Sequence, residues 1–228
     1  MTISLGDRRA RRVGLLGGSF NPAHAGHRHA AVMALRRLRL DQVWLLVSPG
    51  NPLKAGQGMA TLAERLASAR AIADGRRIVA TAIEARLRTR FTVDTLRALR
   101  RRFPRVRFVW LMGADNLAQF HRWHGWLEIV HTTPVAVLPR PSYNHRALAS
   151  QAAQRFRRYR RAAHLAPGLA DMTSPAWVFL PGPQHAASAT AIRAAQNGRP
   201  EGRPERKPPP SPASPPPSRR LNPPTTGP

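Results

Sequence analysis

Two histidines near the amino terminus, His24 and His27, have a spacing that suits the binding of one anion. They follow a glycine-rich stretch over residues 17–22, which itself follows a short apolar run over residues 13–16. This order predicts a strand, a tight turn and a helix start, the arrangement by which α/β proteins present backbone N–H groups to a phosphate. Because side chains three residues apart on a helix share a face, both imidazoles would point at the anion. The further donors expected at this turn are Gly17, Gly18, Ser19 and Phe20.

Two other interpretations compete for the same histidines. They could be solvated surface residues, or they could form half of a zinc site. The zinc interpretation is weak, because the chain has no cysteine and carboxylates are lacking near this stretch. The glycine turn in its strand–turn–helix context favours the anion site.

A second group of anion-binding side chains lies near the end of the predicted domain. Ser188 and Thr190 stand at the start of a predicted helix over residues 189–196, where hydroxyls can also serve only as helix caps. Arg193 follows Thr190 by three residues, so a hydroxyl and a guanidinium can face the same phosphate.

Three further segments place polar, charged and aromatic residues next to predicted strands. They cover residues 48–54, 90–97 and 113–124. Asp115 follows a glycine at the carboxyl end of a predicted strand, which is where an α/β sheet binds its ligand. We therefore expect Asp115 at the site.

The other residues of these segments have ordinary structural roles as alternatives. Asn51 can belong to a common turn, and Lys54 can be a surface charge. Phe91 and Trp123 can pack in the core, and Thr92 can cap its helix.

The elements that must position these residues alternate between apolar, strand-like runs and helical patterns. Strands are expected over residues 13–16, 43–47, 77–80, 106–112, 134–138 and 177–180. Helices are expected over residues 25–38, 62–73, 93–102, 117–120 with a further turn at 126–130, 146–161 and 189–196. This alternation predicts an α/β fold with a doubly wound, mostly parallel sheet, whose ligands sit beyond the carboxyl ends of the strands.

The 228 residues fit one folded domain with extensions. We expect a loose amino-terminal arm over residues 1–11, a domain over residues 12–197, and a disordered tail over residues 198–228. The tail is dominated by proline, serine and arginine, a composition that builds neither helix nor sheet. No apolar run approaches the length of a membrane span, and the absence of cysteine is compatible with a reducing cytoplasm, where we expect the protein to work.

The formal net charge of +26 comes almost entirely from arginine, since Lys54 and Lys207 are the only lysines. Such an excess of arginine over lysine suggests a GC-rich genome that favours arginine codons, which is a compositional cause and not a mechanistic one. A strongly basic protein concentrates anions and can bind nucleic acid without specificity. Aromatic residues for base stacking are scarce among the basic ones, so no specific nucleic acid is expected. A basic nucleic-acid-binding protein that kept the fold remains the alternative from another class.

The stretch from Gly17 to His27 resembles the GGxFxPxHxGH signature of the nucleotidyltransferase superfamily, and residues 188–193 resemble its ISSTxIR segment, with Ala189 in place of the usual second serine. With the three middle segments, residues 12–197 resemble bacterial nicotinate-nucleotide adenylyltransferases. Phosphopantetheine adenylyltransferases share the first motif, but their pattern has threonine where His24 stands.

The resemblance implies a Rossmann-like nucleotidyltransferase fold and transfer of the adenylyl group of ATP to nicotinate mononucleotide, giving nicotinate adenine dinucleotide and pyrophosphate in NAD biosynthesis. His24, His27 and Arg193 would be the catalytic residues, with Ser188 and Thr190 at the phosphates. Magnesium would accompany ATP, held mainly by phosphate oxygens. The residues implied for the acceptor pocket are Asn51, Lys54, Phe91, Thr92, Asp115, Trp123 and Arg140.

A sister enzyme that acts on nicotinamide mononucleotide or another phosphorylated acceptor stays open as an alternative. The oligomeric state also stays open, a homo-oligomer included.

Overall fold

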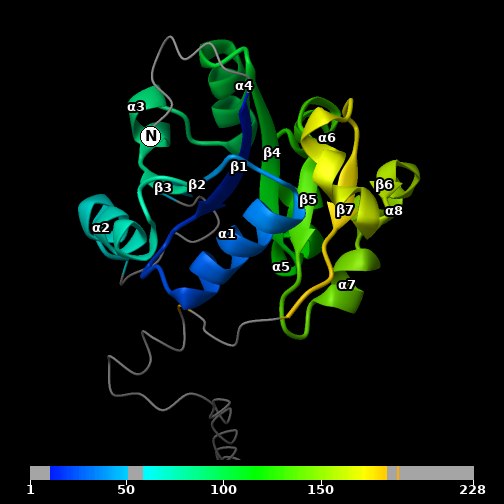
Figure 1. The fold of residues 1–228 in the computed structure, drawn as a ribbon, viewed down its shortest axis with the longest axis horizontal. Helices are drawn as coiled ribbons and strands as arrows, with labels where there is room; N and C mark the ends of the chain where they lie inside the picture. Colours follow the sequence, from blue (N-terminus) through cyan, green and yellow to red (C-terminus); the bar gives the residue numbers. More distant parts are fainter. Residues whose placement is uncertain (1–10, 51–58, 184–188, 190–228) are drawn as a thin grey trace, which may run out of the picture.

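The computed structural model describes residues 11–50, 59–183 and 189. Its centre is a sheet of seven parallel strands in the order β3-β2-β1-β4-β5-β7-β6, which Figure 1 shows from one face. The strands are β1 (Arg11–Gly18), β2 (Gln42–Val47), β3 (Ile78–Thr81), β4 (Val106–Gly113), β5 (Val135–Leu138), β6 (Arg160–Arg161) and β7 (Trp177–Phe179). The expected doubly wound α/β fold is thus confirmed, and every strand pair is parallel.

The helices connect these strands across both faces of the sheet. The α-helices are α1 (Ala25–Arg37), α2 (Leu62–Ile72), α3 (Ile83–Leu87), α4 (Thr92–Arg102), α5 (Ala114–Gln119), α6 (Trp126–Thr132), α7 (Asn144–Leu148) and α8 (Gln151–Arg155). The 3-10 helices are η1 (Phe120–Arg122), η2 (Arg157–Tyr159) and η3 (Ala163–Asp171). Among the helices of this described part, none combines the length and the apolarity needed to cross a membrane.

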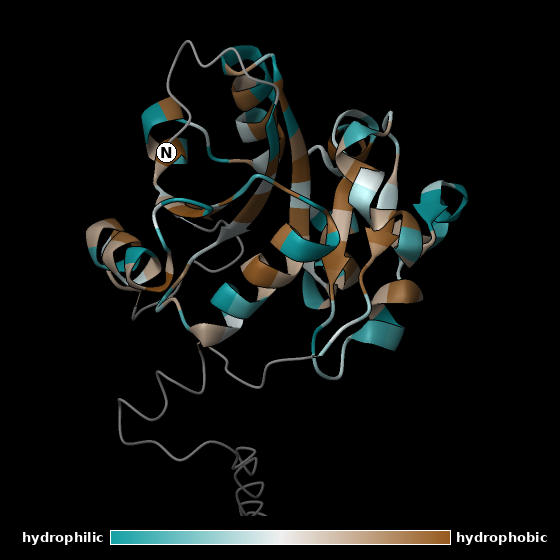
Figure 2. Ribbon diagram, in the orientation of Figure 1, coloured by the Kyte–Doolittle hydropathy of each residue, from teal (hydrophilic) through white to brown (hydrophobic). Residues whose placement is uncertain are grey.

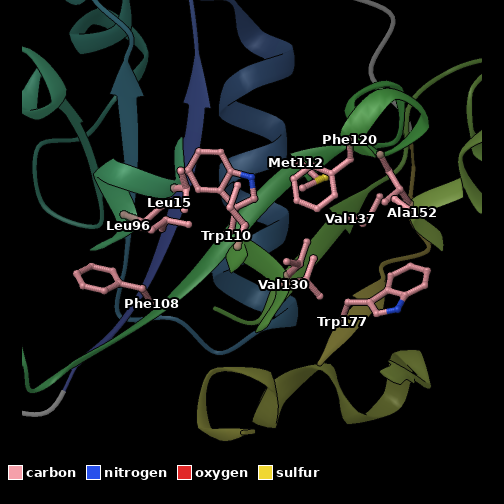
Figure 3. Close-up of a cluster of buried hydrophobic side chains, with 14 of the residues drawn as sticks. Leu15, Leu96, Phe108, Trp110, Met112, Phe120, Val130, Val137, Ala152 and Trp177 are labelled. Carbon is pink, nitrogen blue, oxygen red and sulfur yellow. The ribbon is translucent and has the colours of Figure 1, made fainter. Parts of the chain in front are cut away.

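Alternate residues of each central strand pack into two separate cores. In β1, Leu15 joins a cluster with α4, α5, α6 and α8, whereas Leu16 joins a cluster with α1, α2 and η3. In β2, Trp44 faces the first cluster and Leu45 the second. Successive side chains of a strand point to opposite faces of the sheet, and helices cover both faces. Residues on both sides of a central strand are therefore buried, so the strand sequences contain continuous apolar runs. Figure 2 shows the apolar residues concentrated on the central strands, and Figure 3 shows part of the first cluster, around Trp110.

One predicted helix is wrong. Residues 146–161 do not form a single helix but divide into the end of α7, then α8, η2 and β6. Ser150 causes the first break, because its Oγ accepts a hydrogen bond from the N–H of Ala153 and so begins a new helix. At the far end, Arg160 and Arg161 pair with β7 as an edge strand. Tertiary pairing overrides the helical composition there.

Smaller differences concern the ends of elements. Strand β1 begins at Arg11, so this residue belongs to the sheet and not to the expected arm over residues 1–11. The helix expected at residue 117 begins at Ala114, and α3, β6 and η3 were not expected. The rest of the arm, the expected tail over residues 198–228 and the expected helix after residue 189 lie outside the described residues.

The order of the strands places the ligand-binding edge between β1 and β4. The strands run outward in space from β1 through β2 to β3 on one side, and from β4 through β5 to β7 and β6 on the other. In sheets of this kind ligands bind at such a reversal, beyond the carboxyl ends of the strands. Gly18 ends β1 and Gly113 ends β4 there.

Candidate active site

A cavity of about 930 Å³ opens at this edge of the sheet. Most of the site residues expected from the sequence line it. Those on the phosphate side are Gly17, Gly18, Ser19, Phe20, His24 and His27. Those on the acceptor side are Phe91, Thr92, Asp115, Trp123 and Arg140. The cavity therefore brings together residues from four separate segments of the chain.

The two imidazoles form the cap of α1. His24 is the N-cap residue, and its Nδ1 accepts a hydrogen bond from the N–H of Gly26 at 3.1 Å. The Nδ1 of His27 accepts from the N–H of His24 at 3.2 Å. A nitrogen that accepts from a backbone N–H carries no proton of its own, so each neutral ring has its proton on Nε2. Both histidines are thus hydrogen-bond donors through Nε2.

The surroundings of His27 keep it neutral. Burial, followed by the proximity of His24 and of the Arg140 guanidinium, lowers the pKa of His27 from 6.5 to about 3. Its ring lies 4.9 Å from the ring of Phe20 and 3.9 Å from that of His24, measured between centroids. At neutral pH His27 can therefore donate a hydrogen bond to a phosphate but has little tendency to take up a proton.

The carboxyl end of β1, just before the turn, has space only for glycine at position 17. A β-carbon at Gly17 would lie 2.6 Å from the Cη2 atom of Trp110. The backbone then reaches Phe20, whose φ of 49° is in the left-handed region that favours glycine. The Phe20 ring is almost completely buried, so packing holds this residue in the unfavourable conformation.

Aromatic side chains form the acceptor side of the cavity. The rings of Phe91 and His124 lie 4.5 Å apart between centroids. Trp123 packs edge-on against Phe120 and Trp110, and it lines the cavity as well. Both structural and binding roles for Trp123 are therefore compatible with its position.

Thr92 does not cap its helix. The N-cap of α4 is Phe91, and no side chain bonds to the backbone there. Phe91 is instead held through its carbonyl oxygen, which accepts from the Thr95 hydroxyl at 3.3 Å. The single proton of this hydroxyl is shared with the buried carboxyl of Glu84, whose Oε1 lies nearer, at 3.0 Å. The Thr92 side chain therefore makes no capping bond, and the residue lines the cavity.

Asp115 and Arg140 form a loose ion pair at the end of β4. The Nε atom of Arg140 lies 3.6 Å from the Oδ1 atom of Asp115. This Oδ1 is buried and accepts no hydrogen bond from the described residues. Arg140 thus compensates the charge of Asp115 in the cavity wall without forming a close hydrogen bond to it.

Five of the expected site residues lie outside the described residues: Asn51, Lys54, Ser188, Thr190 and Arg193. The structure nevertheless shows the course of the chain up to residue 183, shortly before the segment over residues 188–193. The Pro181 carbonyl accepts from Arg37 at 3.2 Å, and the Pro183 carbonyl lies 3.0 Å from Nε2 of His29. Ala189, where the family pattern has serine, lines the cavity.

Several lining residues were not expected from the sequence. Among them are Glu84, Trp110, His124 and Tyr143. His124 stands next to Trp123 in the sequence, so a search of that segment could have found it. Glu84 and Trp110 gave no signal, because one belongs to a short unexpected helix and the other to a buried strand.

Comparison with known proteins agrees with this geometry. A family model described as cytidylyltransferase-like matches residues 15–195. A protein of Gluconacetobacter diazotrophicus named "Probable nicotinate-nucleotide adenylyltransferase" is 60% identical over 83% of this chain and 88% of its own length. The chain belongs to the nicotinate-nucleotide adenylyltransferase family. A relative of the same name from Gluconobacter oxydans is 58% identical over 83% of this chain and 97% of its own length.

A solved structure shares the fold of this nicotinate-nucleotide adenylyltransferase family member. The nicotinic acid mononucleotide adenylyltransferase of Plasmodium falciparum, complexed with NaAD, aligns with a TM-score of 0.62 over 80% of this chain and 82% of that one. The same enzyme complexed with APC gives a TM-score of 0.60. At 13% sequence identity this likeness concerns the arrangement of strands and helices.

Proposed function

We propose that the protein transfers the adenylyl group of ATP to nicotinate mononucleotide in NAD biosynthesis, in the cytoplasm. The observation that carries the proposal is the pair of imidazoles at the start of α1, whose Nδ1 atoms both accept from backbone N–H groups and which share one cavity with an aromatic wall. Membership of the family supports the reaction. The Plasmodium falciparum enzyme, which was solved with NaAD and with APC, supports the substrates.

The transfer is an in-line substitution at the α-phosphorus of ATP. A 5′-phosphate oxygen of nicotinate mononucleotide forms the new bond to this phosphorus, and the bond to the β-phosphate oxygen breaks, so that pyrophosphate leaves. A phosphate monoester is largely ionised near neutral pH, because its second pKa is about 6. The attacking oxygen thus needs no general base, and catalysis rests on positioning and charge stabilisation.

The roles of the phosphate-side residues follow from their hydrogen bonds. His24 and His27 would donate Nε2–H to the α- and β-phosphates, where negative charge develops. The turn over residues 17–20 would add backbone donors. Thr190 and Arg193 would hold the distal phosphates, as the family pattern implies.

The acceptor would bind against the aromatic wall. Phe91 or Trp123 would stack on the pyridine ring, and the hydroxyl of Thr92 would face its carboxylate. Donors arranged for a carboxylate would be left unpaired by the neutral amide of nicotinamide mononucleotide, which disfavours that substrate. We infer a preference for the acid form on this ground.

Magnesium would accompany ATP. The described residues contain no group of three or more histidine or acidic side chains able to hold a metal ion, and Asp115 is a single carboxylate residue in the cavity wall. Such a site fits a magnesium ion that takes most of its ligands from phosphate and water. The ion would neutralise charge on the triphosphate as pyrophosphate leaves.

The test is pyrophosphate release from ATP and magnesium, with nicotinate and nicotinamide mononucleotides compared as acceptors. The informative variant is His27→Asn, because the asparagine Oδ1 can replace Nδ1 in the helix cap while the Nε2 donor is lost. His164→Ala, at an exposed histidine outside the cavity, is the matched control.

Strong release with the acid form, weak release with the amide and loss in His27→Asn would support the reaction and its specificity. Equal release with both acceptors would contradict the carboxylate preference. No release with either would contradict the proposed reaction. Binding to nucleic acid that weakens steeply with salt would then become the leading alternative.

A further inference from the structure

A buried arginine on α2 lies directly behind the two loops that meet at the cavity. Arg65 is only 3% exposed. No carboxylate of the described residues forms an ion pair with it. A buried guanidinium normally requires a carboxylate or a full set of hydrogen-bond acceptors, because leaving it unpaired is costly. The hydrogen-bond partners of Arg65 therefore indicate its role.

Among the described residues all of the acceptors of Arg65 are backbone carbonyls, and they come from two loops. The Nη1 atom donates to Ser19 at 2.9 Å and to Ser48 at 2.6 Å. The Nη2 atom donates to Pro49 at 3.3 Å, and Nε donates to Ala60 at 2.9 Å. One planar group thus joins the turn after β1 to both ends of the connection between β2 and α2. Lysine, with a single ammonium, cannot reproduce this fork.

The bond to Ser19 orients the phosphate turn. In a trans peptide the C=O and the following N–H point in opposite directions. Because the Ser19 carbonyl points at Arg65, the N–H of Phe20 points away from α2. The unfavourable φ of Phe20 is also held from this side, since the hydroxyl of Ser68 lies 3.3 Å from the Phe20 carbonyl and accepts from the N–H of Ala23 at 3.1 Å.

The bonds to Ser48 and Pro49 fix the other loop. This loop begins where β2 ends, and Ser48 and Gly50 line the cavity. It leads directly to Asn51 and Lys54, which the family pattern assigns to the acceptor. The N–H of Ser48 also donates to the carbonyl of Gly18 at 3.0 Å, so the two loops contact each other as well as Arg65.

We propose that Arg65 is a positioning residue for adenylyl transfer, which holds the triphosphate turn and the acceptor loop in register so that the two substrates meet in line. The proposal rests on the proposed function. Ser68 assists on the phosphate side alone, because apart from a bond to the Arg65 carbonyl within its own helix at 2.9 Å its hydroxyl contacts only the turn over residues 20–23. The two residues should consequently give different kinetic signatures.

The experiment compares Arg65→Lys, Arg65→Met and Ser68→Ala in the full chain. Arg70→Met, at an exposed arginine one turn further along the same helix, is the matched control. For each variant kcat and the KM of both substrates are measured by pyrophosphate release, and thermal unfolding is followed by circular dichroism. Assays are run well below each unfolding midpoint, so that loss of folded protein does not enter the rates.

We expect Arg65→Met to lower kcat/KM for both substrates by about 100-fold, the order of loss that a small misplacement of reacting groups causes. Arg65→Lys should show a smaller loss of kcat/KM than Arg65→Met but should remain below wild type. Ser68→Ala should raise the KM of ATP alone. Arg65→Lys also serves if Arg65→Met does not fold. In Arg65→Ala, millimolar guanidinium should restore turnover, which a general loss of stability would not allow.

Wild-type kinetics in a folded Arg65→Lys or Arg65→Met protein would overturn the proposal. An effect of both variants on the KM of one substrate alone would also overturn it, because the two loops would not then be coupled. Failure of the proposed function would look different. The wild-type protein and Arg70→Met would then release no pyrophosphate at all.

Discussion

The indole ring of Trp110 occupies the space that a β-carbon at Gly17 would need, with 2.6 Å between that carbon and Cη2. The two residues lie on neighbouring strands, β1 and β4, at the reversal of strand order where the cavity opens. The closeness of the phosphate turn to the sheet is therefore set by a core side chain. Packing and binding are coupled at this point.

Replacing Gly17 by alanine should consequently affect both stability and activity. We expect Gly17→Ala to destabilise the fold by about 1–3 kcal/mol, as overpacking does, and to lower the rate of pyrophosphate release. Urea unfolding and initial rates measure the two effects. Gly168→Ala, where a β-carbon meets nothing within 4 Å, is the control.

A second substitution tests the cause. Trp110→Phe removes the atom that alanine would contact, so the double variant should recover part of the loss. A double variant as impaired as the sum of the two single ones would indicate that Gly17 is needed for another reason.

The depressed pKa of His27 predicts a loss of stability in acid. Between pH 6.5 and about 3 the unfolded chain binds a proton at His27 that the folded protein does not. This contribution is present above pH 6.5 and is lost as the pH falls, by about 1.4 kcal/mol per unit. From about pH 7.5 to about pH 5 the wild-type protein should therefore lose about 2 kcal/mol more than His27→Asn. Urea titrations over this range would measure the difference, and equal losses would contradict the assignment.

Glu84 should have the opposite dependence. Burial raises the pKa of its carboxyl, against the lowering effect of the hydrogen bond from Thr95. The folded protein then holds a proton that the unfolded chain releases, so this contribution to stability falls as the pH rises above 4.5. Glu84→Gln keeps an acceptor for Thr95 and removes the charge. Relative to wild type it should gain stability towards alkaline pH, and a difference that does not change with pH would exclude this explanation.

Thr92→Val tests the acceptor side on its own. The substitution keeps the shape of the side chain but removes the hydroxyl of a residue that lines the cavity. We expect the KM of nicotinate mononucleotide to rise about tenfold, the value of roughly one hydrogen bond to a charged group, while the KM of ATP stays unchanged. Thr132→Val, outside the cavity lining, is the control. A rise in the KM of ATP would contradict the assignment of Thr92 to the nicotinate mononucleotide site.

Much of this site could be predicted because its residues stand next to signals of local structure. His24 and His27 follow a strand and a glycine turn, and Asp115 follows a glycine at a strand end, so the fold class alone places them at one edge. Thr61 and Glu64 likewise have the spacing of a capping box, and they form one at the start of α2.

The remaining parts depend on contacts between distant segments. Arg65 reads as a surface residue of a helix, and only the folded chain brings the carbonyls of Ser19 and Ser48 to it. Arg160 and Arg161 read as the end of a helix, yet pairing with Trp177 and Val178 makes them a strand. No local pattern carries such information.

The cap of α1 has a consequence for how the site acquires its chemistry. In a free imidazole the proton exchanges between two nitrogens, and no neighbour decides where it stays. Here the backbone of the first helical turn occupies Nδ1 of both rings. Folding itself thus selects the tautomer, because formation of the first helical turn leaves the proton of each ring on Nε2.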